Sequence, residues 1–134
     1  MVRAKIYLWT GNGWGKTTSA FGAALRALGQ GYKVTIIQFM KGRKNEIGEY
    51  KIQGKLKGLI VKQFGRKGWV NLKNPVAEDR KLALQGLNYG YSAIKTKPFL
   101  LVLDEINLAC AIGLLRKKEV LDFLDAVDGK YTTI

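Results

Sequence analysis

The sequence predicts a single α/β domain over residues 1–134, with a mostly parallel sheet flanked by helices. Short apolar runs alternate with longer segments of helical periodicity, which is the pattern of β-α units. The most apolar run, 99–103, has the length and composition of a strand buried on both faces. With 47% hydrophobic and 25% charged residues, the 134-residue chain has the composition of one ordered domain.

Each strand is predicted from a short apolar or β-branched run. These runs occupy residues 6–9, 34–39, 59–64 and 99–103. The last residues, 130–134, have the pattern of a strand that has barely begun.

Helices are predicted where apolar residues recur at helical spacing. The predicted helices are 16–28, a segment from Pro75 to about residue 94, and 106–127 with a break near Gly113 or residues 116–118. The charged, glycine-rich segment 40–58 and the segment from 65 to 74 are predicted mainly as loops.

The residue inventory excludes several classes of function. The chain has no histidine, so a histidine base, a Ser-His-Asp triad and a conventional zinc site are excluded. The lone Cys110 cannot form an internal disulfide, and its apolar neighbours predict a buried structural thiol. There is no apolar run of membrane-spanning length and no signal-peptide pattern, so we predict a cytoplasmic protein without a membrane partner.

The positive charge is unevenly distributed along the chain. The formal net charge is +13, and Glu46 and Glu49 are the only acidic residues before residue 78. The excess therefore lies in the first 77 residues, most densely from Lys41 to Lys67. This asymmetry fits either a solvated lysine-rich surface or a site for an anionic partner, such as nucleic acid, an acidic protein or a polyphosphate.

A glycine-rich loop lies between the first predicted strand and the first predicted helix. Residues 10–18 read TGNGWGKTT. Glycines let backbone N–H groups surround phosphate oxygens, Lys16 supplies a cation, and the Thr17 hydroxyl can reach a magnesium ion. The loop departs from the strict P-loop pattern at Thr10, where a glycine is expected. The spacing predicts a nucleotide site in a P-loop NTPase (RecA-like) fold.

Two carboxylates follow the most apolar run. Asp104 and Glu105 come directly after Leu103, which places them at the carboxyl edge of a parallel sheet, beside the phosphate loop. This position favours a role as oxygen ligands of phosphate-bound magnesium. The alternative is an ordinary acidic pair at a helix N-terminus, and which of the two acids would reach the metal is left open.

Together, these motifs and their flanks resemble the P-loop type ATP:corrinoid adenosyltransferases, also called cob(I)alamin adenosyltransferases. The similarity runs in the family's order through essentially the whole chain. The segments that carry it are the loop 10–18, Ala20-Phe21-Gly22, Ala24-Leu25-Arg26-Ala27, Gln38-Phe39-Met40-Lys41-Gly42, Gly48-Glu49, Leu103-Asp104-Glu105-Ile106-Asn107-Leu108-Ala109 and Gly113-Leu114-Leu115.

The chain departs from the family pattern at three places. Trp14 stands where the family usually has lysine, and Gly68-Trp69-Val70-Asn71 stands where it has Gly-Phe-x-Trp. The family's final strand, with its Thr-Gly-Arg motif, and its last helix do not follow Ile134. The resemblance therefore implies a fold truncated at its C-terminus.

The resemblance implies transfer of the 5′-deoxyadenosyl group of ATP to the cobalt of a reduced corrinoid, with release of triphosphate, as in adenosylcobalamin biosynthesis. The reduced cobalt is the nucleophile, so the protein needs no base of its own. The implied catalytic residues are Lys16, Thr17 and Glu105, and the implied magnesium ligands are Thr17, Asp104 and Glu105. The implied contacts to ATP and corrinoid are Gly11, Asn12, Gly13, Trp14, Gly15, Lys16, Thr17, Thr18, Gln38, Lys41 and Trp69.

The partners of such an enzyme would be ATP, the corrinoid and a second subunit, since family members are usually dimers. We also expect an acidic flavoprotein reductant, steered by a basic patch of Lys41, Arg43, Lys44, Lys51, Lys55 and Lys57 at the ligand-binding edge. A nucleic-acid-stimulated P-loop ATPase is an alternative that suits the charge, although no nucleic-acid-binding motif is recognisable. A nucleotide-binding protein without catalysis is a third possibility.

Overall fold

The computed structural model describes residues 3–43 and 48–134, and within them four strands form one parallel sheet. The strands are β1 (Val34–Phe39), β2 (Leu59–Phe64), β3 (Leu100–Asp104) and β4 (Thr132–Thr133). Their order across the sheet is β2-β1-β3-β4, and every neighbouring pair is parallel. The predicted α/β fold class is therefore confirmed.

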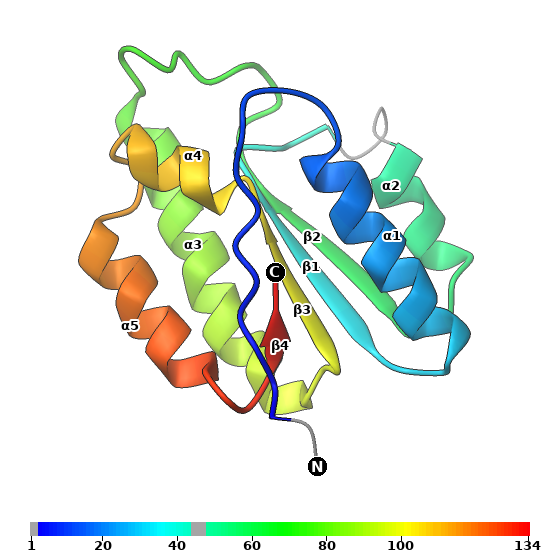
Figure 1. The fold of residues 1–134 in the computed structure, drawn as a ribbon. Helices are drawn as coiled ribbons and strands as arrows, with labels where there is room; N and C mark the ends of the chain where they lie inside the picture. Colours follow the sequence, from blue (N-terminus) through cyan, green and yellow to red (C-terminus); the bar gives the residue numbers. More distant parts are fainter. Residues whose placement is uncertain (1–2, 44–47) are drawn as a thin grey trace.

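Helices cover both faces of the sheet (Figure 1). One face carries α1 (Lys16–Gly29) and α2 (Gly48–Lys51), which continues into the 3₁₀ turn η1 (Ile52–Gly54). The other face carries α3 (Ala77–Ala93), α4 (Ile106–Ala111) and α5 (Lys117–Val127), with the 3₁₀ turn η2 (Ile94–Thr96) after α3. This is the two-sided cover that strands apolar on both faces require.

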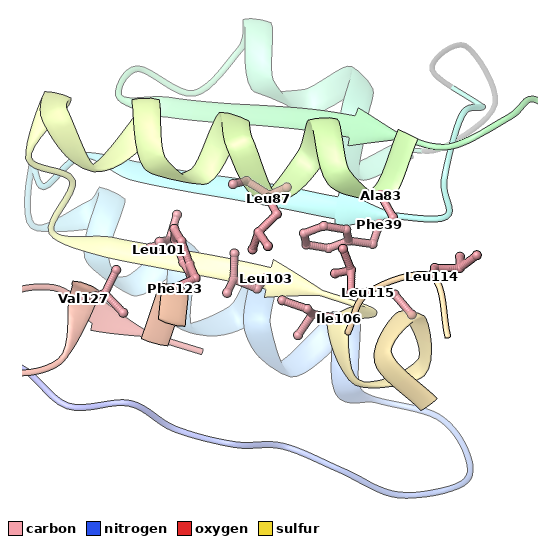
Figure 2. Close-up of a cluster of buried hydrophobic side chains, with 12 residues drawn as sticks. Phe39, Ala83, Leu87, Leu101, Leu103, Ile106, Leu114, Leu115, Phe123 and Val127 are labelled. Carbon is pink, nitrogen blue, oxygen red and sulfur yellow. The ribbon is translucent and has the colours of Figure 1, made fainter. Parts of the chain in front are cut away.

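Two apolar cores result, one on each face. On the face that carries α1, three alanines of this helix pack on even-numbered residues of β1 and β3 and on odd-numbered residues of β2. The cluster comprises Ala20, Ala24, Ala27, Val34, Ile36, Leu59, Val61, Leu100 and Val102. Figure 2 shows the larger core, in which side chains of α3, α4 and α5 meet Phe39, Leu101 and Leu103. Near the carboxyl ends of β1, β2 and β3, the buried polar side chains of Gln38, Gln63 and Asp104 replace apolar ones.

Helix α3 lies very close to the sheet because two of its residues lack a side chain. A Cβ added at Gly86 would lie 2.9 Å from Cε1 of Phe39, and one added at Gly90 would lie 2.9 Å from the Phe123 ring. Both aromatic rings are completely buried. These two helical glycines therefore set the distance between α3 and its neighbours.

The predicted first strand at 6–9 is wrong. Only Ala4 and Ile6 form single bridges, to Gly129 and Thr133, and residues 7–10 are exposed. The reason is that β4 takes the place beside β3, through the pairs Leu100↔Thr132 and Leu101↔Thr133, so the N-terminal segment runs along the outside (Figure 1).

Most other element predictions are confirmed. β1 and β2 have the predicted bounds, β3 is shifted by one residue, and the last helical stretch is broken between residues 111 and 117. The segment 40–58, predicted mainly as loop, instead contains α2 and η1. These turns carry the chain from the carboxyl end of β1 back to the amino end of β2. Within the described ranges, no helix is both long and apolar enough to cross a membrane.

Candidate functional site

The glycine-rich loop has a backbone shape that requires glycine. Gly11, Gly13 and Gly15 have φ angles of 136°, 142° and 101°, a region that other residues rarely adopt. Gly15 is the N-cap of α1 and offers no side-chain cap to the helix. The first backbone N–H groups of α1 therefore face outward without a side-chain partner, which is an arrangement that binds anions.

Lys16 folds back over this loop. Its ammonium Nζ donates hydrogen bonds to the carbonyl oxygens of Gly11, at 2.6 Å, and Gly13, at 3.1 Å. The positive charge is thereby held at the centre of the loop, among the exposed residues Asn12, Gly13 and Trp14. A phosphate entering the loop would meet this charge together with the helix N-terminus.

A polar cluster joins the start of α1 to the carboxyl ends of β1 and β3. Thr17 Oγ1 donates to Asp104 Oδ1 at 2.9 Å, and Lys41 Nζ forms an ion pair with Asp104 Oδ2 at 2.6 Å. Lys41 Nζ also lies 3.4 Å from Thr17 Oγ1. The Asp104 side chain is 6% exposed and that of Lys41 is 21% exposed, so the carboxylate is shielded from water while a cation sits beside it.

This cluster has the donors that magnesium prefers. Thr17 and Asp104 supply a hydroxyl and a carboxylate oxygen, which are hard ligands, and the Lys41 ammonium already occupies a cation position between them. Among the described residues no group of three His, Cys, Asp or Glu side chains gathers to hold a metal. A magnesium ion bound here would need further oxygen ligands, which the phosphates of a nucleotide can supply.

Glu105 lies apart from this cluster. It is the N-cap of α4, its φ of 67° lies in the left-handed region, and its side chain is partly exposed. Among the described residues its carboxylate makes none of the hydrogen bonds or ion pairs of the site. The structure thus brings Asp104, rather than Glu105, to Thr17.

Three buried polar side chains form a row across the sheet. Gln63 Nε2 donates to Gln38 Oε1 at 2.9 Å, and Gln38 Nε2 donates to Asp104 Oδ2 at 3.1 Å. Each is the fifth residue of its strand, and the strand registers Gln38↔Gln63 and Gln38↔Asp104 align them. Gln38 was predicted as a ligand-binding residue, whereas Gln63 was missed. The signal that could have found it is its place in β2, which matches that of Gln38 in β1.

The loop after β2 presents Trp69 at the surface. Its side chain is 85% exposed, and the Arg43 guanidinium lies 5.0 Å from the ring centroid. Arg43 also donates from Nε to the backbone oxygen of Lys67, at 3.3 Å. Trp14, on the phosphate loop, is fully exposed. Both tryptophans are therefore available for a planar ligand, and neither forms part of a core.

A second ion pair anchors this loop to α3. Arg66 donates two hydrogen bonds to Asp79, at 2.7 and 3.1 Å, and Asp79 also accepts from the backbone N–H of Val76. The hydrogen bonds from Arg66 hold the pKa of the buried Asp79 carboxyl below its ordinary value, although burial alone would raise it. The loop that carries Trp69 is thus fixed at one end, and sequence reasoning missed both residues.

A cavity of about 590 Å³ lies beside the glycine-rich loop. It is lined by the N-terminal segment, the loop, the end of β3 and α4, and it includes Trp9, Lys16, Asp104 and Glu105. Asn107 closes one wall by donating from Nδ2 to the Trp9 carbonyl at 3.1 Å. The volume lies within the usual range for small-molecule sites.

The predicted basic patch does not form as expected. Lys41 points inward to Asp104, and Lys44 lies outside the described residues. Lys55 and Lys57 precede β2 and therefore lie at the amino edge of the sheet, where the Val34 N–H donates to the Gly58 carbonyl at 2.9 Å. The prediction is wrong for Lys55 and Lys57, because α2 and η1 return the chain across the sheet before these lysines.

Comparison with known proteins gives a family and several relatives. A family model described as "ATP:corrinoid adenosyltransferase BtuR/CobO/CobP" matches residues 3–134. A 40-residue segment is 60% identical to a corrinoid adenosyltransferase of Escherichia coli K12, 58% to corrinoid adenosyltransferase CobA of Salmonella typhimurium and 52% to a corrinoid adenosyltransferase of Pseudomonas aeruginosa. This segment covers 30% of the chain and 20% of each relative.

Proposed function

Because the chain belongs to the ATP:corrinoid adenosyltransferase family BtuR/CobO/CobP, we propose that it transfers the 5′-deoxyadenosyl group of ATP to a reduced corrinoid. In this reaction the Co(I) centre of the corrinoid substrate attacks the 5′ carbon of ATP. The bond between that carbon and the triphosphate oxygen breaks, and inorganic triphosphate leaves with the bonding electron pair. The cobalt becomes alkylated, and no proton has to be transferred by the protein.

One observation supports this proposal most directly. The phosphate loop and the Thr17–Asp104–Lys41 cluster bring three kinds of group to one edge of the sheet: backbone N–H donors, ammonium cations and oxygen ligands. A departing triphosphate is highly negative, and these are the groups that stabilise developing negative charge. A reaction whose nucleophile belongs to the substrate requires no protein base, so these groups suffice for the proposed chemistry.

The chain's own residues have separable tasks in this scheme. The loop residues Gly11, Asn12, Gly13 and Gly15 and the α1 residues Lys16, Thr17 and Thr18 would hold the triphosphate. Thr17 and Asp104 would hold magnesium, with Glu105 as an additional candidate ligand. The ion, when bound, would neutralise part of the charge on the leaving group.

On the corrinoid side, the exposed aromatic residues are the candidates for contact. Trp69 has an accessible ring at the carboxyl edge, and Trp14 extends from the phosphate loop. Arg43, which lies over the Trp69 ring, would help to orient that ring. Delivery of electrons by an acidic flavoprotein remains part of the proposal, but Lys55 and Lys57 are at the wrong edge to guide it.

The test is to incubate the protein with ATP, Mg²⁺ and chemically reduced cob(I)alamin and to record the corrinoid spectrum. We expect the cob(I)alamin bands to be replaced by those of an alkylcobalamin, with one triphosphate released per corrinoid. Release of phosphate that depends on added nucleic acid, without a change in the corrinoid, would instead identify a nucleic-acid-stimulated ATPase. ATP binding without either product would identify a nucleotide-binding protein without catalysis.

A further inference from the structure

We propose that Gln63 is a positioning residue for the phosphate and metal site, although it lies two strands away from Asp104. It acts through Gln38, which stands between them on β1. This inference rests on the proposed function, because it takes Asp104 as an oxygen ligand of the magnesium bound with ATP.

The three side chains form a continuous and buried hydrogen-bonded row. Gln38 is completely buried, Asp104 is 7% exposed and Gln63 is 9% exposed. The bond from Gln63 Nε2 to Gln38 Oε1 is 2.9 Å long, and that from Gln38 Nε2 to Asp104 Oδ2 is 3.1 Å long. Because strand register aligns the three residues, the row is held by the backbone of the sheet.

The charge of Asp104 determines which atoms donate and which accept along this row. Asp104 is paired with the Lys41 ammonium, and an ionised carboxylate can only accept hydrogen bonds. Gln38 must therefore turn its NH₂ group toward Asp104 and its carbonyl oxygen toward Gln63. Gln63 must in turn direct its own NH₂ group toward Gln38.

This arrangement leaves one buried acceptor unused. Gln63 Oε1 has no hydrogen-bond partner, and it is the one buried side-chain atom of this kind among the described residues. Burial of an unpaired carbonyl is unfavourable, and an apolar side chain of similar size would avoid it. The feature that Gln63 supplies and an apolar residue lacks is the N–H donor directed at Gln38.

The consequence is a fixed orientation for the Asp104 carboxylate. With Gln38 donating to Oδ2, the other oxygen, Oδ1, accepts from Thr17 at the start of α1. Without the donor from Gln63, the Gln38 amide is free to turn and to present its oxygen to Asp104, which would repel the carboxylate. Groups that orient a metal ligand in this way commonly change metal affinity about 10–100-fold when they are removed.

The test compares Gln63→Met and Gln63→Glu with the control Gln53→Met. Methionine keeps the length of the side chain but removes the donor, and glutamate replaces the donor by an acceptor. Gln53 is the matched control. It accepts a hydrogen bond from the N–H of Val61, which lies in β2 like Gln63, but Gln53 is not a member of the row. Calorimetry would give ATP affinity with and without Mg²⁺, and NMR would follow the Gln38 side-chain amide in the ligand-free protein.

We expect both Gln63 variants to weaken Mg²⁺-dependent ATP binding about tenfold or more and to change Mg²⁺-free ATP binding less than twofold. The Gln38 amide signals should shift in both variants, and Gln53→Met should match the wild type in every measurement. Equal losses of Mg²⁺-dependent ATP affinity in Gln53→Met and Gln63→Met would mean that the effect comes from a general disturbance of β2, and this would overturn the proposal.

An Asp104→Asn arm separates this inference from the proposed function. If Asp104→Asn weakens Mg²⁺-dependent binding while both Gln63 variants bind like the wild type, Gln63 has no positioning role and the metal site stands. If Asp104→Asn itself leaves Mg²⁺-dependent binding unchanged, the metal assignment fails and the role of Gln63 fails with it.

Discussion

At the scale of single residues, Lys16 has the clearest role. Among the described residues, its ammonium donates hydrogen bonds to two backbone carbonyls of the glycine-rich loop, and Lys16 belongs to neither apolar core. Charge-assisted hydrogen bonds contribute about 1.5–3 kcal/mol each, and about 1.4 kcal/mol corresponds to a tenfold change in binding. We expect Lys16→Ala to weaken ATP binding at least tenfold, measured by calorimetry, with an unchanged thermal unfolding midpoint.

Lys57→Ala is the matched control for this change. It removes the same charge from the basic half of the chain, but at the amino edge of the sheet, away from the loop. ATP affinity should stay within twofold of the wild type. Equal losses in the two variants would show that ATP responds to net charge rather than to the loop.

The two acids after β3 should differ in their effect. Asp104 contacts Thr17, Gln38 and Lys41, whereas the Glu105 side chain stands outside this cluster. We expect Asp104→Asn to raise the magnesium concentration that half-saturates turnover about tenfold or more, and Glu105→Gln to raise it less. Titration of initial rate with Mg²⁺ checks this order, and the reverse order would place the metal at Glu105.

Sequence alone indicated which residue types could make the candidate site, but not how they pair in the structure. The spacing of the loop and the acidic pair after an apolar run indicated phosphate and metal chemistry. The contact of Lys41 with Asp104, and the row that includes Gln63, depend on register between strands far apart in the chain. No local pattern contains that information.

At the scale of secondary-structure elements, the glycines of two helices offer a direct comparison. Gly22 in α1 has open space where a Cβ would lie, whereas a Cβ at Gly86 in α3 would meet the buried Phe39 and the partly buried Phe64. Alanine favours a helix by about 1 kcal/mol over glycine, and overpacking a core costs about 1–3 kcal/mol. Gly22→Ala should therefore stabilise the protein and Gly86→Ala should not.

Urea unfolding would measure both changes. We expect the two variants to differ by about 1–3 kcal/mol in the free energy of unfolding, because helix propensity contributes equally to each. A shift of equal size and sign in the two variants would mean that α3 does not press on the sheet as described.

Strands and helices were predicted well where the local sequence shows an apolar run or apolar residues at helical spacing. β1 and β2 are apolar or β-branched runs, and α1 and α3 repeat apolar residues at helical spacing; the structure contains all four close to the predicted bounds. Residues 6–9 have an equally apolar sequence but form no strand, because β4 pairs with β3 in the place such a strand would need. Competition between segments for one place is settled by the tertiary structure.

At the scale of the whole molecule, stability should depend on pH through Asp79. Its folded pKa is lowered, so the ion pair with Arg66 contributes stability at pH values above the unfolded pKa, about 3.9, and this contribution is lost as the pH falls through the lower folded pKa. We expect Asp79→Asn to lower the free energy of unfolding by about 1–3 kcal/mol at pH 7. The difference from the wild type should shrink below about pH 4.

Asp128→Asn provides the control for this pH dependence. Asp128 pairs with Arg3 at 3.0 Å, but both side chains are more than half exposed. Exposed pairs contribute between about 0 and 1 kcal/mol, so this variant should remain near the wild type from pH 7 to pH 3. Denaturant unfolding across that range gives both comparisons, and a constant deficit of Asp79→Asn at every pH would argue against the ion pair.

The loop after β1 has a consequence for how two substrates would influence one another. Lys41 reaches Asp104 and Arg43 reaches Trp69, and only one residue separates them. A metal ion bound beside Asp104, as proposed above, would compete with the Lys41 ammonium for the carboxylate, and a movement of Lys41 would then act on Arg43 and the tryptophan. If the chain binds ATP and a corrinoid as proposed, this connection would make their binding cooperative. By thermodynamic reciprocity, the factor by which ATP changes corrinoid affinity must equal the factor by which corrinoid changes ATP affinity, whichever binds first.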